Sequence, residues 1–153
     1  MSALAAGAGV RPGDPFPPLA EARLEGALPA TEGRVLLVDF WASWCAPCKA
    51  SFPALAKLHA EYASRGVVVL GVSVDDRAAD YAAFLKKHAP PFATVRDHTH
   101  ALAAAAQVPA MPTTFVIGRD GRVRTVQAGY HGKATDEALR AAVDAALADS
   151  SSS

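Results

Sequence analysis

The chain has 153 residues, which is enough for one domain with a sizeable hydrophobic core. Its 15 basic and 15 acidic residues give a formal net charge of zero, and no basic stripe stands out that would attract nucleic acid. No apolar stretch is long enough to span a bilayer, so an integral membrane protein is not expected.

The first segment predicts little regular structure. Residues 1–13 are expected to form a flexible arm, and residues 1–10 lack the leading Lys or Arg and the continuous apolar region of a secretory signal. The protein therefore either stays in the cytoplasm or has lost an export signal or anchor. Residues 12–33 contain several prolines and predict an extended segment, with a short edge hairpin around Glu25 and Gly26.

A buried strand followed by a helix comes next. Residues 34–41 are a nearly unbroken apolar run rich in β-branched residues, which predicts a strand covered on both faces. Apolar residues then recur at helical spacing, which predicts a helix over about 46–64. Pro47 suits the first turn of this helix, because an N–H there would have no intrahelical partner.

The rest of the chain alternates between strands and helices. Residues 67–74 predict a second buried strand, after which Asp75 and Asp76 are expected to cap a helix. Thr135 or Asp136 is expected to cap the last helix, and residues 149–153 predict a disordered Ser-rich tail. The remaining predicted elements are a short strand at 94–96, an alanine-rich helix at 99–107, strands at 113–117 and 122–128 joined by a Gly-containing turn, and a helix at 135–148. This order predicts an α/β fold with a mixed central sheet and helices on both faces.

The only two cysteines, Cys45 and Cys48, lie where the first strand leads into the helix. Residues three apart share one helix face, about 5–6 Å between Cβ atoms, so a disulfide can close there with little strain. The helix N-terminus lowers the pKa of a nearby thiol from about 8.5 toward 7 or below. Cys45, expected to be the more exposed, should attack a disulfide, and the more buried Cys48 should resolve the mixed disulfide.

Three other interpretations of the cysteine pair are weaker. A structural disulfide that closes so small a loop would remove little chain entropy. Zinc would require four ligands, and the sequence has neither a second cysteine pair nor clustered histidines. His98 and His100 are instead expected to cap a helix or face solvent. Because two unrelated buried thiols would not explain the strand–helix setting, the pattern favours redox chemistry and no metal site.

Four parts of the sequence match a known family. They are the block 38–49 around the cysteines, which differs in the Ala46-Pro47 dipeptide, Pro53, the segment 111–115, and the predicted closing hairpin with Gly129. With these parts the chain resembles the thioredoxin superfamily, and within it the branch related to TlpA and ResA. The resemblance covers about residues 14–148 and implies a thioredoxin-like domain with an N-terminal extension and an extra helix before a cis-proline hairpin. It also implies that Pro53 kinks the active-site helix.

Two acids have expected roles at the cysteines. Asp39 lies within an apolar strand, where burial should raise the pKa of its carboxyl. The resemblance implies that Asp39 is the general base for Cys48, whereas the alternative is a local hydrogen-bonding role. Asp76 aligns with a glutamate that assists the buried cysteine in ResA-like proteins, although it is one methylene shorter and is equally expected to be only a helix cap.

The resemblance also implies a surface for the substrate. A cis bond before Pro112 would turn the Met111 backbone toward the disulfide, where it could pair with an extended substrate segment. Trp44 and Met111 would form an apolar rim around Cys45, with Gly129 at the same edge, and ordinary surface packing is the alternative. No catalytic role is expected for His131 or Tyr130.

Three functions are compatible with these features. The leading hypothesis is a thiol–disulfide oxidoreductase that reduces partner proteins through Cys45 and Cys48, is recycled by an upstream reductant, needs no other cofactor and acts as a monomer. A peroxidase of the peroxiredoxin type would carry a Thr where Ala42 stands. A copper(I) carrier of the Sco type would space its cysteines further apart and add a histidine. The resemblance implies the bacterial periplasm or cell envelope, but the glutamate that cytochrome c maturation reductases carry after the cis-proline is replaced by Thr113.

Overall fold

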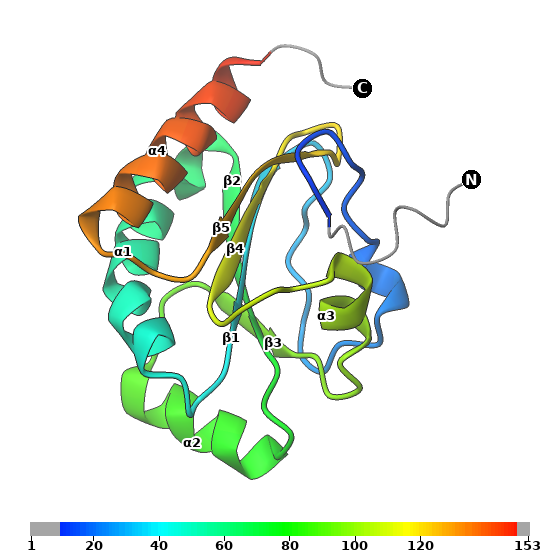
Figure 1. Cartoon of the computed structure of the whole chain (residues 1–153), viewed down its shortest axis with the longest axis vertical. Coiled ribbons are helices and arrows are strands. Elements are labelled where there is room, and N and C mark those ends of the chain that lie inside the picture. The colour runs from blue at the N-terminus through cyan, green and yellow to red at the C-terminus, as the bar shows by residue number, and fades with distance from the viewer. Residues whose placement is uncertain (1–9, 150–153) are drawn as a thin grey trace.

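The computed structural model describes residues 10–149 and places the domain around one central sheet (Figure 1). Residues 150–153 of the predicted tail and residues 1–9 of the predicted arm lie outside the described residues. The elements are η2 (Leu19–Glu21), β1 (Val35–Trp41), α1 (Ala46–Tyr62), η3 (Ala63–Arg65), β2 (Val67–Ser73), α2 (Ala78–His88), β3 (Ala93–Arg96), α3 (Ala101–Ala106), β4 (Thr113–Ile117), β5 (Val123–Ala128) and α4 (Lys133–Ala148).

The sheet is mixed, as the sequence predicts. Its strand order is β3-β2-β1-β4-β5. β1 lies in the centre, parallel to β2 and antiparallel to β4, and its register pairs Asp39 with Gly71 on one side and Thr114 on the other. Because β1 and β2 are parallel, the loops that follow them emerge at the same edge of the sheet.

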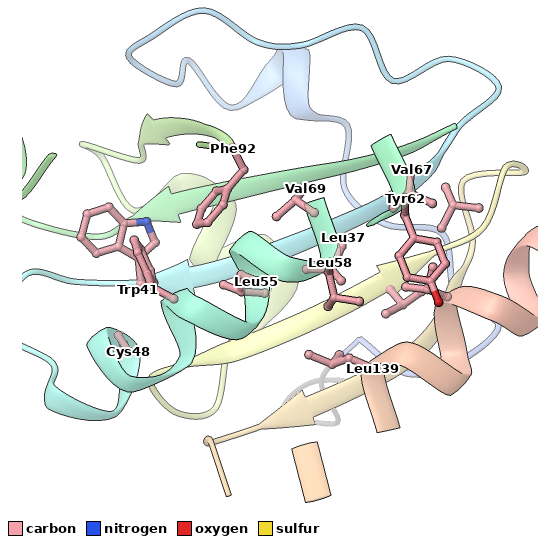
Figure 2. Close-up of a cluster of buried hydrophobic side chains, with 14 of the residues drawn as sticks. Leu37, Trp41, Cys48, Leu55, Leu58, Tyr62, Val67, Val69, Phe92 and Leu139 are labelled. Carbon is pink, nitrogen blue, oxygen red and sulfur yellow. The ribbon is translucent and has the colours of Figure 1, made fainter. Parts of the chain in front are cut away.

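Each face of the sheet has its own hydrophobic core. Alternate β1 residues point to opposite faces, so Leu37 and Trp41 join one core while Val38 and Phe40 join the other. The first core is covered by α1, α2 and α4, and Figure 2 shows Leu55 and other α1 side chains packed over the sheet. The second core is covered by α3 and by the segment from Val10 to Leu24. Both faces are therefore covered, which confirms the predicted architecture.

One N-terminal prediction is wrong. Glu25 and Gly26 do not form a local hairpin, because Glu25 forms an isolated antiparallel bridge with Arg96 at the β3 edge, with both backbone hydrogen bonds at 2.9 Å. The described end of the arm, residues 10–13, is attached to the closing hairpin, since the Gly13 N–H donates to the Val123 carbonyl at 2.8 Å.

The predicted caps are also wrong. α2 follows Arg77 and α4 follows Gly132, and neither N-cap residue makes a side-chain capping bond. Thr135 and Asp136 instead lie inside the first turn of α4. The Thr135 hydroxyl accepts from the His131 N–H at 2.9 Å, and the Asp136 carboxylate accepts from the Tyr130 hydroxyl at 3.0 Å.

Candidate active site

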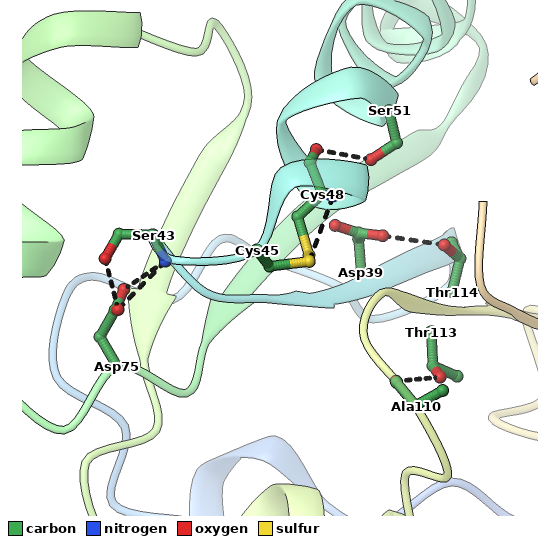
Figure 3. Close-up of a disulfide and its surroundings, with 9 residues drawn as sticks. All are labelled: Asp39, Ser43, Cys45, Cys48, Ser51, Asp75, Ala110, Thr113 and Thr114. Atoms are coloured by element: carbon green, nitrogen blue, oxygen red, sulfur yellow. Dashed lines mark hydrogen bonds between the residues drawn. A yellow bond between two sulfur atoms is a disulfide. The ribbon is translucent and has the colours of Figure 1, made fainter.

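The two cysteines form a disulfide at the N-terminus of α1 (Figure 3). Cys45 is the N-cap residue, and its Sγ accepts a hydrogen bond from the Cys48 N–H at 3.2 Å. The Cα atoms lie 5.3 Å apart. Cys45 is 5% exposed and Cys48 is fully buried, which is the predicted order. Pro47 lies in the first turn, as expected.

Asp39 is the buried acid on β1, the strand that leads to this disulfide. Its side chain is fully buried, and its Oδ1 accepts a hydrogen bond from the Thr114 hydroxyl at 2.8 Å. Its Oδ2 has no hydrogen-bond partner among the described residues, and Figure 3 shows the carboxyl between Thr114 and the cysteines. Burial raises the pKa of Asp39 to about 7, although the Thr114 hydrogen bond opposes this rise. The carboxyl can therefore hold or release a proton near neutrality.

The loop before β4 supplies the expected cis-proline. The Met111–Pro112 peptide bond is cis, and Met111 is half-buried against both cores. The Thr113 hydroxyl donates to the Ala110 carbonyl at 2.6 Å, and the Gly129 N–H donates to the Pro112 carbonyl at 2.6 Å. Gly129 has φ of +80°, a conformation that favours glycine. The end of β5 is thereby attached to the cis-proline loop.

The active-site helix combines an exposed start with a buried inner face. Trp44, next to Cys45, has 69% of its surface exposed, whereas Trp41 is fully buried. Pro53 lies inside α1, where it cannot donate a hydrogen bond to the carbonyl one turn earlier. The rim formed by Trp44 and Met111 and the kink at Pro53 remain predictions.

The acid that contacts the active-site loop is Asp75, for which the sequence predicts only a helix cap. Asp76 is largely exposed, and its carboxylate pairs with His100 at 3.1 Å. Asp75 is 1% exposed and accepts hydrogen bonds from Ser43, just upstream of Cys45. The parallel pairing of β1 and β2 was the available signal, because it brings the loops that follow these strands together.

Within residues 10–149, no group of three or more His, Cys, Asp or Glu side chains could hold a metal ion. In the same part of the chain, no helix has the length and apolar character needed to cross a membrane. His98 lies 3.8 Å from Glu25, and His100 precedes α3 without a side-chain capping bond.

Comparison with known proteins places this site in a family. The Redoxin family matches residues 11–143. The chain is 33% identical over 98 residues to the thiol-disulfide oxidoreductase ResA of Bacillus subtilis, covering 64% of this chain and 55% of ResA. It is 37% identical over 119 residues to a thiol:disulfide interchange protein DsbE homolog of Paracoccus denitrificans, covering 74% of this chain and 64% of that protein.

The chain also matches a solved structure from Chlorobium tepidum, which is assigned as a thiol:disulfide interchange protein DsbE. It superposes with a TM-score of 0.79 at 33% identity and covers 90% of this chain and 99% of that one. The chain spans about half the length of the ResA proteins that it matches. Sequence, fold and site agree, and the chain belongs to the Redoxin family with a thioredoxin-like fold.

Proposed function

We propose that this chain is a thiol–disulfide oxidoreductase that reduces the disulfides of partner proteins. The observation that carries the proposal is the Cys45–Cys48 disulfide at a helix N-terminus, with the buried Asp39 on the strand that leads to it. The names of the ResA and DsbE relatives support this activity over the peroxidase and the copper(I) carrier.

The reaction proceeds in two exchanges that conserve electrons. The Cys45 thiolate attacks one sulfur of the partner's disulfide, forming a mixed disulfide and releasing the other partner sulfur as a thiolate. The Cys48 thiol then gives its proton to the Asp39 carboxylate and attacks Cys45 Sγ. This step closes the Cys45–Cys48 disulfide and releases the second partner thiolate. The partner gains two electrons, which an upstream dithiol reductant restores to the chain by the reverse exchange.

The substrate segment docks beside the disulfide in this proposal. The Met111 backbone, turned by the cis bond before Pro112, pairs with an extended stretch of the partner. Trp44 supplies exposed apolar surface at the same edge, and Gly129 fixes the neighbouring strand end. Pro47 and Pro53 shape the helix that carries the cysteines.

We also propose where and with whom the protein works. The resemblance to TlpA and ResA supports a place in the bacterial periplasm or cell envelope, and fractionation of the source cells with a cytoplasmic marker tests this compartment. The partners are disulfide-bearing proteins and a reductant, with no nucleic acid, and the chain acts as a monomer with no cofactor beyond its own disulfide.

The function is tested by insulin reduction with dithiothreitol and by trapping. The wild type should accelerate insulin reduction, and C45S should abolish the acceleration because the attacking sulfur is lost. C48S should accumulate a mixed disulfide with insulin that a non-reducing gel resolves, because the resolving thiol is absent. Failure of the wild type to accelerate reduction, or trapping by C45S instead of C48S, would contradict the proposal.

The direction of electron flow is tested by the reduction potential. Equilibration with dithiothreitol or glutathione, followed by tryptophan fluorescence, gives the potential of the cysteine pair. A value near or below about −250 mV is expected for a reductase, whereas a value near about −120 mV would indicate an oxidant and overturn the reducing role.

A further inference from the structure

A second buried carboxylate holds the loop that leads to the disulfide. Asp75 follows β2, and its carboxylate accepts from the Ser43 N–H at 3.0 and 3.1 Å and from the Ser43 hydroxyl at 2.7 Å (Figure 3). Ser43 lies between β1 and α1, directly before Trp44 and two residues before Cys45. One carboxylate thus binds both the backbone and the side chain of the residue that precedes the exposed Trp44.

Asp75 is itself held both at its side chain and at its backbone. The Ser73 hydroxyl donates to Asp75 Oδ2 at 2.7 Å and accepts from the Asp75 N–H at 2.9 Å. The Arg96 guanidinium, which is nearly buried, donates to the Asp75 carbonyl at 3.0 Å and pairs with Glu25 at 2.8 Å. Hydrogen bonds to an ionised acceptor are about twice as strong as neutral ones. The orientation of Asp75 is therefore set by β2, β3 and the N-terminal segment.

The two ends of the loop are also held, because Ala42 and Cys45 are buried in the first core and Cys45 is in the disulfide. The Cys45 N–H donates to the Ala42 carbonyl at 3.1 Å and closes a turn, but the Trp44 side chain projects into solvent. A loop that is ordered before the partner arrives avoids an entropic cost when the partner binds.

From these contacts we propose that Asp75 is a positioning residue for disulfide exchange. It holds Ser43 so that Trp44 and Cys45 are presented together to a protein substrate, and it touches neither the reacting sulfurs nor the substrate. The inference rests on the proposed oxidoreductase function and assigns a role within it that the sequence analysis did not foresee.

The test compares Asp75→Ala and Asp75→Asn with a matched control, Asp97→Ala. Asp97 is also fully buried, and its carboxylate also accepts from backbone N–H groups, those of Leu102 at 3.2 Å and Ala103 at 2.8 Å. These bonds lie at the start of α3 and do not involve the active-site loop. Asp97→Ala therefore reports the general effect of losing a buried acid.

The measurements are kcat/KM for insulin, the rate with the small disulfide 5,5′-dithiobis(2-nitrobenzoic acid), and the anisotropy of tryptophan emission. Asp75→Ala should lower kcat/KM for insulin by roughly tenfold to a hundredfold more than Asp97→Ala, mainly through KM. It should lower the anisotropy and change the small-disulfide rate much less. Asp75→Asn should recover most of the loss, because its amide oxygen still accepts from the Ser43 N–H.

The other possible outcomes also decide whether the positioning role holds. Equal kcat/KM for Asp75→Ala and Asp97→Ala overturns the proposal. If Asp75→Ala does not fold, Ser43→Ala removes the hydroxyl donor at a half-buried position, and kcat/KM equal to that of the wild type overturns the proposal. If the wild type reduces neither disulfide, the proposed function fails, and unchanged anisotropy in Asp75→Ala would separately contradict the positioning role.

Discussion

At the scale of single residues, Asp39 combines full burial with one unpartnered oxygen. Thr114 binds Oδ1, and Oδ2 has no hydrogen-bond partner among the described residues. An ionised carboxylate in such a place is poorly solvated, which is why the pKa of Asp39 rises to about 7. A pKa near the working pH is what a group needs to accept a proton in one step and return it in another.

Asp39→Asn should slow resolution of the mixed disulfide. The amide keeps the shape and can still accept from Thr114, but it cannot take the proton of Cys48. The rate of the second exchange, followed by stopped-flow tryptophan fluorescence, should fall on the order of 10²-fold at pH 8. In the wild type this rate should rise through about pH 7 as Asp39 ionises, and the variant should lack that inflection.

The first exchange provides the internal control for Asp39→Asn. Attack by Cys45 on the small disulfide needs no proton transfer from Cys48, so its rate should change far less. An equal loss in both exchanges would mean that Asp39 acts on the fold of the site and not as the base.

Residues that act locally were predictable, and those with distant partners were not. The spacing of Cys45 and Cys48 predicts a redox pair, and the apolar neighbours of Asp39 in the sequence predict that it is buried. Asp75 looked like a helix cap because an acid after a strand is common there. Its partner Ser43 is 32 residues away, and only the three-dimensional structure selects that contact over the cap.

At the scale of elements, the register between β1 and β4 affects the pKa of Asp39. Asp39 faces Thr114 across the antiparallel pair, and the hydroxyl bonds the carboxyl. This hydrogen bond lowers the pKa of Asp39 and so opposes the effect of burial. The position of β4 therefore decides how far the acid departs from an ordinary carboxyl.

Thr114→Val should move the pKa of Asp39 further upward. Valine keeps a similar shape but removes the hydroxyl donor, so the ionised form loses a stabilising contact. Carbon-13 NMR of labelled aspartate carboxyl groups, with the Asp39 signal assigned by its loss in Asp39→Asn, should show a midpoint above about 7.

Thr125→Val on β5 is the matched control for that titration. Thr125 is half-buried in the same sheet, and its hydroxyl accepts from the Gln127 side-chain amide at 3.5 Å, whereas the Thr114 hydroxyl donates to Asp39. The Asp39 midpoint should stay unchanged in this variant. A midpoint that shifts equally in both variants, or downward in Thr114→Val, would show that the hydroxyl does not stabilise the carboxylate.

Strands and helices were predictable to within a few residues, but their ends and edges were not. Apolar runs and helical spacing reflect which residues are buried, and burial determines the sequence pattern in the middle of an element. The wrong caps of α2 and α4 and the bridge of Glu25 to Arg96 share another cause. At element ends the backbone has several possible partners, and tertiary contacts choose among them.

At the scale of the whole molecule, one strand serves both the core and the site. All seven residues of β1 are buried, six of them apolar and one the acid Asp39. The apolar residues stabilise the fold, whereas an ionised Asp39 opposes it because its charge lies far from water. The acid proposed to serve catalysis should therefore lower the stability of the protein at neutral and alkaline pH.

Because the ionised form of Asp39 is disfavoured in the folded protein, stability should decrease as pH rises. The pKa of Asp39 is 3.8 as a free side chain and about 7 in the folded protein, so between these values the folded state binds the additional proton. Stability from this group is fully present below about pH 4, decreases as pH rises, and is lost above about pH 7. Between these two pKa values the slope is about 1.4 kcal/mol per pH unit.

Urea unfolding of the oxidised wild type and of Asp39→Asn at several pH values isolates this contribution. The cysteines do not titrate in the disulfide, and the other ionisable groups are common to both proteins, so their effects cancel in the difference. The wild type should lose about 3 kcal/mol relative to Asp39→Asn between pH 4.5 and 7.5. A difference that stays constant with pH would mean that the folded protein tolerates the ionised carboxylate. The pKa of Asp39 would then not be raised by burial, and the argument that Asp39 is a base tuned by burial would fail.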